Sequence, residues 1–172
     1  MTTDYRSLIR NIPDFPQPGI IFRDITPLLA DADALRRAVG DLAARFNGLE
    51  IDRVVAIESR GFLLGAPVAL EMGAGFVPVR KAGKLPHRTY QAKYELEYGS
   101  AAIEMHQDAL LEHHQVLLVD DVLATGGTMV AAIDLVQQAG AQVAGVAVLI
   151  ELTALNGRAR LGEFPFHSVI TY

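Results

Sequence analysis

Four short apolar runs constrain this chain more than any other feature. Runs without polar interruption are covered on both faces, which is the environment of a parallel sheet. They are Val54–Ile57, Gly75–Val79, Val116–Val119 and Val143–Ile150. Between them, helical patterns are expected at Asp31–Asn47, Gly61–Met72 and Thr128–Ala139. The order strand, helix, strand with short connections predicts an α/β fold with a mainly parallel sheet flanked by helices.

Two segments depart from this order. Residues 1–30 are broken by prolines, and we interpret Ile20–Ile25 within them as an edge strand over the core. Residues 80–100 are rich in Arg and Lys and contain Gly83 and Pro86, so we predict a long basic loop there. No linker or internal repeat divides the 172 residues, and we expect a single domain over 1–172.

Composition narrows the class of protein. The net charge is −5, so we do not expect the surface as a whole to attract nucleic acid or an anionic membrane. The chain has no cysteine, which excludes disulfides, thiolate catalysis and cysteine-ligated zinc. No apolar run reaches membrane-spanning length and the N-terminus has no signal-peptide pattern, so we expect a cytoplasmic protein.

The most informative motif for function is at residues 116–128, VLLVDDVLATGGT. An apolar strand leads into Asp120 and Asp121, and a glycine-bearing turn over Ala124–Thr128 precedes a helix. Main-chain N–H groups at such a turn, with the helix dipole and threonine hydroxyls, favour a phosphate. The paired carboxylates suit a partner that donates hydrogen bonds, such as a ribose diol or hydrated magnesium. Together they indicate a ribose 5-phosphate site.

Simpler interpretations exist for each part of this motif. Adjacent aspartates at a strand end can form a solvated turn, and two glycines before a helix can be turn chemistry alone. The motif is not a P-loop, because no lysine follows the glycines. The combination in this order favours the ligand site.

VLLVDDVLATGGT resembles the signature of the type I phosphoribosyltransferases. The resemblance implies phosphoribosyl pyrophosphate as substrate, Mg²⁺, a hood at residues 1–30 and a flexible catalytic loop at 80–100. It also implies a division of roles among the phosphoribosyl-binding residues. Asp120 and Asp121 would bind the ribose hydroxyls and touch the magnesium through water, with no direct protein ligand. The 5′-phosphate would be bound by Ala124, Thr125, Gly126, Gly127 and Thr128.

A second set of residues is implied for pyrophosphate. The turn after Val54–Ile57 reads Glu58-Ser59-Arg60-Gly61-Phe62, and relatives hold a cis peptide there. The pyrophosphate residues would be Ser59, Arg60, Arg80, Lys81 and Lys84. Positioned cations stabilise the charge that develops on departing pyrophosphate. A surface salt bridge for Arg60 and a merely solvated basic loop are the simpler alternatives.

The segments FPQPGIIFRDITPLL and Leu96–Gly99 resemble the adenine-specific members of the family, over roughly residues 5–172. The resemblance implies that adenine stacks on Phe22 and is read by main-chain groups of Ile21 and Arg23, with Leu123 and Leu152 opposite. Glu97 would manage the proton near purine N7. The implied catalytic residues are Glu97, Arg80, Arg60 and Asp121.

The expected reaction converts adenine and phosphoribosyl pyrophosphate into AMP and pyrophosphate in a homodimer, where Arg80 can reach the neighbouring site. Two alternatives stay open. One is an enzyme of this family for another base, such as guanine or xanthine. The other is a regulator that keeps the fold, senses phosphoribosyl pyrophosphate and binds nucleic acid.

Overall fold

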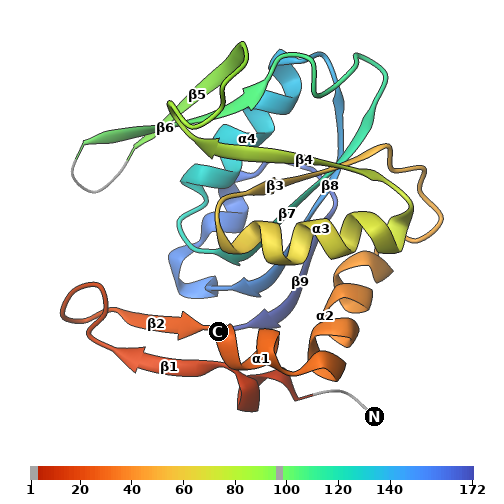
Figure 1. Ribbon diagram of the computed structural model, residues 1–172. Helices are drawn as coiled ribbons and strands as arrows, with labels where there is room; N and C mark the ends of the chain where they lie inside the picture. Colours follow the sequence, from red (N-terminus) through yellow and green to blue (C-terminus); the bar gives the residue numbers. More distant parts are fainter. Residues whose placement is uncertain (1–3, 96–98) are drawn as a thin grey trace.

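The computed structural model describes residues 4–95 and 99–172 and has a seven-stranded central sheet (Figure 1). The strands lie in the order β5-β6-β4-β3-β7-β8-β9, and the five from β4 to β9 in that order pair in parallel. Their bounds are β3 Arg53–Ile57, β4 Gly75–Lys81, β5 Thr89–Glu95, β6 Ser100–His106, β7 Gln115–Leu123, β8 Gln142–Glu151 and β9 Phe166–Thr171. The predicted α/β class is confirmed.

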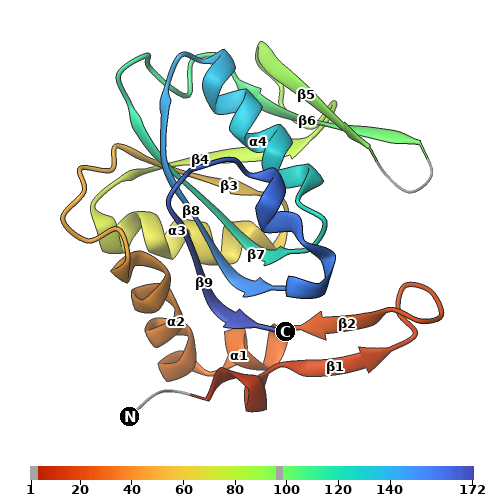
Figure 2. The same ribbon diagram turned by 180° about the vertical axis from the view of Figure 1, so that it is seen from behind.

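Helices cover both faces of this sheet, with α2 and α3 on one side and α4 on the other (Figures 1 and 2). The α-helices are α1 Thr26–Ala30, α2 Ala32–Ala44, α3 Arg60–Met72 and α4 Gly127–Gln138. The 3-10 helices are η1 Tyr5–Leu8, η2 Thr153–Leu155 and η3 Gly157–Arg160. The Asp31 carboxylate accepts from Ala34 N–H at 2.8 Å and so caps α2.

Strand alternation divides the interior into two cores. Along β3, Val54 and Ala56 pack beneath α2 and α3, whereas Val55 and Ile57 pack beneath α4. All four side chains are at most 4% exposed. An unbroken apolar run is therefore what a strand buried on both faces requires. In the described part of the chain, no helix is long and apolar enough to cross a membrane.

The N-terminal segment forms its own small sheet. β1, Arg10–Pro13, pairs antiparallel with β2, Ile21–Asp24, and neither belongs to the central sheet. The expected edge strand at Ile20–Ile25 is thus corrected to one strand of a separate hairpin. Ile21 is 51% exposed, while Ile25 at its end is fully buried and fixes the hairpin to the core.

The prediction of an unstructured basic loop over 80–100 is wrong in its secondary structure. β4 continues to Lys81, and β5 and β6 pair antiparallel, so the connection between β4 and β5 shrinks to residues 82–88. Ala92 is buried beneath α4 with Tyr90 and Tyr94 beside it, and this apolar face fixes the strand. Apolar and polar residues alternate along β5 in the sequence, but the prediction followed the basic charge of the stretch and its Gly and Pro instead.

Candidate functional site

The two aspartates lie within strand β7, not after it. The expected end at Val119 is corrected to Leu123, because β7 keeps pairing with β8 through Val122↔Ile150 and Leu123↔Glu151. Main-chain pairing continues although the side chains become polar. The carboxylates therefore stand on a rigid element at the carboxyl edge of the parallel sheet, where ligands of such folds bind.

Asp121 is paired with Arg60 from the first position of α3. Arg60 Nε lies 2.7 Å from Asp121 Oδ2, and the aspartate side chain is 8% exposed. The two groups form a close ion pair without a well-directed hydrogen bond. Asp121 Oδ2 is buried and has no hydrogen-bond partner among the described residues. A buried carboxylate oxygen thus keeps acceptor capacity for a ligand hydroxyl or a water.

Asp120 is held beside a like charge. Burial, and then the charge of Asp121, raises the pKa of Asp120 well above its ordinary value. Asp121 N–H donates to Asp120 Oδ1 at 2.8 Å, which fixes the carboxyl orientation. The close approach depends on Gly61, because a Cβ there would lie 2.7 Å from Asp120 Oδ1. The sequence did not reveal this glycine, since the two positions meet only in the fold.

The turn from β7 into α4 encloses a small cavity. It has a volume of about 90 Å³ and is lined by Asp120 and residues 122–129. Gly126 has φ +85°, which a non-glycine residue would adopt only with strain. The residues predicted to bind the 5′-phosphate, Ala124, Thr125, Gly126, Gly127 and Thr128, all border this space, and their role stays a prediction. Main-chain donors at the N-terminus of twelve-residue α4 give it the character of an anion site.

A second segment supports that turn from behind. A Cβ on Gly157 would overlap the Ala124 carbonyl oxygen, so the main chain at η3 packs directly on the turn. Arg160 Nη1 also donates to the Thr125 carbonyl at 3.0 Å. Sequence reasoning missed both residues. Both residues act through contact with a turn that is distant in the sequence, so no local sequence pattern predicts their role.

The predicted pyrophosphate residues come from three elements. The Glu58–Ser59 peptide is cis, as expected, and Ser59 precedes Arg60 at the start of α3. Arg80 Nε and Lys84 Nζ both reach the Glu58 carboxylate, at 2.9 and 3.0 Å. Lys81 lies between these two at the end of β4, and its side chain is exposed.

Glu58 is a buried counter-ion that the sequence analysis did not single out. Burial pushes the pKa of Glu58 upward, but hydrogen bonds from Lys84, Arg80 and the Lys81 N–H outweigh it and hold the pKa below its ordinary value. The carboxylate thus stays charged and fixes two cations. Unpaired N–H groups remain on both cations for an anionic ligand.

Phe22 is the part of the hairpin that faces the aspartates. The Arg60 guanidinium lies 4.7 Å from the Phe22 ring centroid, and Phe15 packs edge-on at 5.2 Å. Arg60 therefore touches both Asp121 and Phe22. It joins the proposed base-binding hairpin to the phosphoribosyl side of the site.

The two predicted leucines differ in position. Leu123 is 2% exposed and belongs to the core beneath α4, whereas Leu152 packs with the core on the opposite face. Val122 is partly exposed and shares that opposite face with Leu152. The side chain of Val122 is thus better placed than that of Leu123 to meet a base near the hairpin. Strand alternation along β7 could have indicated this.

Two predicted features remain, the proton-handling residue and the magnesium site. Glu97, the expected proton-handling residue, lies outside the described residues. Over residues 4–95 and 99–172, no cluster of three or more His, Cys, Asp or Glu could hold a metal ion.

Comparisons with known proteins agree with this geometry. The family described as phosphoribosyl transferase domain matches residues 28–163. The chain is 55% identical to an adenine phosphoribosyltransferase of Roseiflexus sp., over all of both chains.

Solved structures extend the comparison. An adenine phosphoribosyltransferase from Thermoanaerobacter pseudethanolicus superposes with a TM-score of 0.97 at 48% identity, over all of both chains. The enzyme from Saccharomyces cerevisiae, complexed with adenine and an imino-altritol bisphosphate, gives a TM-score of 0.92 at 38% identity over 96% of each chain.

Proposed function

The chain belongs to the phosphoribosyltransferase family, among its adenine phosphoribosyltransferases, and from this premise we propose how its residues divide the reaction. The enzyme transfers the phosphoribosyl group of phosphoribosyl pyrophosphate to adenine, giving AMP and pyrophosphate. The observation that carries the proposal is the adjacent pair of partly exposed Asp120 and buried Asp121 beside a glycine-bearing anion cavity, with Arg60 bridging to Phe22.

The phosphoribosyl half binds at β7 and the turn after it. Main-chain N–H groups of Ala124–Thr128 and the hydroxyls of Thr125 and Thr128 donate to the 5′-phosphate. The carboxylates of Asp120 and of Asp121, the latter paired with Arg60, accept from the ribose hydroxyls. Each hydrogen bond to a charged group contributes about 1.5–3 kcal/mol, so several together hold the sugar firmly.

Pyrophosphate binds against Ser59, Arg60, Arg80, Lys81 and Lys84. Adenine N9 attacks ribose C1 as the bond from C1 to the pyrophosphate oxygen breaks, and its electron pair leaves with pyrophosphate. The cations stabilise this charge in place. Glu58 keeps Arg80 and Lys84 in a fixed position before substrate arrives, and such preorganisation lowers the cost of reaching the transition state.

Adenine lies on Phe22, with main-chain groups of Ile21 and Arg23 reading its edge and with Val122 and Leu152 opposite. The main chain of Leu123 lies beside Leu152, whose N–H donates to the Leu123 carbonyl at 3.0 Å. Glu97 takes the proton that adenine loses as N9 bonds to C1. Exposed Ile21 and partly exposed Phe22 support an open slot here.

Enzymes that use phosphoribosyl pyrophosphate generally use Mg²⁺, and the residues present fit that ion. The carboxylates of Asp121, which is paired with Arg60, and of the adjacent Asp120 offer acceptors for its water shell, while the described chain lacks a third ligand for direct binding. We propose that Asp120 and Asp121 hold a magnesium ion carried by the substrate. When bound, it neutralises charge on the leaving pyrophosphate.

We propose a homodimer as the working assembly. Leu63, Pro67 and Leu70 recur on one face of α3, and the two leucines are 52% and 83% exposed. Exposed apolar side chains grouped in this way favour a protein contact. Sedimentation equilibrium tests the proposal, and a monomer at micromolar concentration would contradict it.

A cytoplasmic location is part of the proposal, because phosphoribosyl pyrophosphate and AMP are both highly charged. Transfer of such groups through hydrocarbon is strongly unfavourable, so substrate and product stay in the compartment that makes them. Fractionation of cells of the source organism tests this location.

The decisive activity test compares bases. The purified protein is supplied with Mg²⁺ and phosphoribosyl pyrophosphate, and kcat/KM is measured for adenine, guanine, hypoxanthine and xanthine. We expect AMP from adenine and at least about 100-fold lower kcat/KM for the 6-oxopurines, since a mismatched exocyclic group leaves buried polar groups unpaired. Preference for a 6-oxopurine would assign another base. Nucleic-acid binding without AMP formation would favour the regulator.

A further inference from the structure

The β1–β2 hairpin must hold a base in register with a ribose that binds on a different sheet. The hairpin is a separate two-stranded sheet, so no strand pairing fixes β2 to the strands of the phosphoribosyl site. Its position therefore depends on side chains. The Arg60–Phe22 contact is one such tie, and it ends on a residue that substrate would itself engage.

A second tie joins the hairpin to Tyr172. The Arg23 guanidinium carbon lies 3.9 Å from the Tyr172 ring centroid, well within the range of a cation–π contact. Arg23 Nη1 donates to Asn11 Oδ1 on the paired strand β1, so the same guanidinium also braces the hairpin. Arg23 Nε is buried with no hydrogen-bond partner among the described residues. The aromatic face is thus the group that compensates the buried cation on that side.

Tyr172 is itself tightly fixed. Its N–H donates to the Glu151 carbonyl at 2.9 Å, and its main-chain oxygen accepts from the N–H and the hydroxyl of Thr153 at 2.8 and 2.6 Å. Figures 1 and 2 show this end of the chain beside β2. The ring is therefore held by the main sheet and presented to the hairpin.

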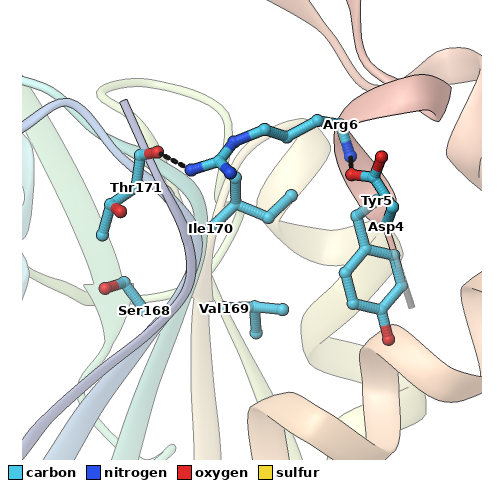
Figure 3. Close-up of a pocket in the computed structure, with 7 residues that line it drawn as sticks. All are labelled: Asp4, Tyr5, Arg6, Ser168, Val169, Ile170 and Thr171. Carbon is cyan, nitrogen blue, oxygen red and sulfur yellow. Dashed lines mark hydrogen bonds between the residues drawn. The ribbon is translucent and has the colours of Figure 1, made fainter. Parts of the chain in front are cut away.

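Arg6 adds a brace from the other side. It lies on η1, where η1 and β9 border a cavity of about 300 Å³, and its guanidinium donates to the Thr171 carbonyl at 2.8 Å (Figure 3). The same guanidinium lies 5.7 Å from the Tyr172 ring. Arg23 and Arg6 thus both lie near the Tyr172 ring, with Arg23 the closer of the two.

This ring is connected to the phosphoribosyl strand by main-chain bonds. Tyr172 bonds to the end of β8 at Glu151, and the next residue, Leu152, donates to the Leu123 carbonyl at the end of β7. β7 carries Asp120 and Asp121. A short path of hydrogen bonds therefore relates the acids that would hold ribose to the ring that holds Arg23.

We propose that Tyr172 is a positioning residue for base recognition: through Arg23 its ring holds the main chain of β2 in register with the phosphoribosyl site. The inference rests on the proposed function, in which β2 reads adenine. It assigns the Arg23 side chain to anchoring, while the Arg23 main chain contacts the base. The consequence is selective, because binding of phosphoribosyl pyrophosphate does not pass through this contact.

The test is a double-mutant cycle on the full chain, with KM for adenine and for phosphoribosyl pyrophosphate measured separately. Tyr172→Leu and Arg23→Met each remove the cation–π contact between Arg23 and Tyr172. If one of the two variants does not fold, the other alone still tests the effect on KM for adenine. We expect each to raise KM for adenine about 5- to 20-fold, with KM for phosphoribosyl pyrophosphate changed less than about twofold. The double variant should add little to either single effect, because both changes delete one contact.

Two further variants separate positioning from general stability. Tyr172→Phe keeps the ring and should restore KM for adenine. Arg158→Met removes a cation–π contact of the same kind, that of Arg158 on η3 with Phe166 on β9 at 4.7 Å, and should leave KM for adenine unchanged. Additive effects, or equal changes in both KM values, in an enzyme that still makes AMP would overturn the inference. Absence of AMP formation by the unaltered protein would instead overturn the proposed function.

Discussion

The turn after β7 and the β1–β2 hairpin meet at one site but are built in different ways. The turn is enclosed by main chain: Gly157 packs on it and Gly126 takes a left-handed conformation. The hairpin is a separate sheet with exposed Ile21 and Phe15, joined to the rest through Arg60, Tyr172 and buried Ile25. The half proposed to bind a constant group is enclosed by main chain, and the half proposed to select a base rests on a few side chains.

The largest expected effect comes from the acidic pair. Replacing Asp120 and Asp121 with asparagine removes the charge that would bind ribose hydroxyls and hydrated magnesium. Loss of two charge-assisted interactions of about 1.5–3 kcal/mol each predicts a fall in kcat/KM of about 100-fold or more. Steady-state kinetics check this, with exposed Asp108→Asn as the matched control. Near-normal kcat and KM in the double variant would remove the acids from the mechanism.

The turn after β7 can also be disturbed through η3, which packs against it. Gly157→Ala would push a Cβ into the Ala124 carbonyl, so the turn must shift. We expect KM for phosphoribosyl pyrophosphate to rise about tenfold, in line with the loss of about 1.4 kcal/mol, while KM for adenine changes little. Gly40→Ala is the control, because a Cβ there meets nothing within 4 Å in the middle of α2. An unchanged KM for phosphoribosyl pyrophosphate would mean that η3 does not shape the anion site.

The hairpin should show the opposite selectivity. Phe22→Ala removes the ring on which adenine would stack, and stacking on an aromatic side chain contributes about 1–3 kcal/mol per base. KM for adenine should therefore rise about 5- to 100-fold, with KM for phosphoribosyl pyrophosphate affected only through the lost Arg60 contact. Phe15→Ala serves as the matched variant, since Phe15 touches the edge of Phe22. If both substrates respond equally to Phe22→Ala, the two regions are not functionally distinct.

The smallest effect is on stability. Because burial and the neighbouring Asp121 raise the pKa of Asp120, the folded protein holds this proton from the ordinary pKa of 3.8 up to the raised value. Over that window stability falls as pH rises, because the native state binds more protons than the unfolded chain. Asp120→Asn keeps an acceptor for Asp121 N–H and removes the repulsion.

We therefore expect the ligand-free Asp120→Asn protein to have a higher Tm than the unaltered protein. A gain of about 1 kcal/mol corresponds to about 2–4 °C for a chain of this size. Calorimetry at pH 5 and pH 8 checks it, and the gain should be larger at pH 8. A lower Tm at pH 8 would show that the paired charges do not oppose folding.

The sequence predicted the parts of the fold that local chemistry determines. Unbroken apolar runs located the parallel strands, and Asp31 capped its helix. The strand at Thr89–Glu95 was missed although Tyr90, Ala92 and Tyr94 alternate with polar residues, because the basic charge of the stretch was interpreted as a loop. No strand was assigned to Phe166–Thr171, where charged and glycine-rich neighbours weaken the pattern.

In the site, the phosphate turn and the acids were readable because their residues are consecutive. Glu58, Gly61 and Gly157 were not, since each acts through contact with a distant element. The choice of Leu123 over Val122 ignored strand alternation, which the sequence does contain. Roles that depend on tertiary contacts need coordinates, whereas roles carried by one turn do not.

A crystal structure of the complex with AMP would show both regions of the site at once, because one ligand spans them. We expect phosphate in the turn over Ala124–Thr128, ribose hydroxyls on Asp120 and Asp121, and adenine against Phe22. Phosphate bound elsewhere, or adenine away from the β1–β2 hairpin, would contradict this expectation.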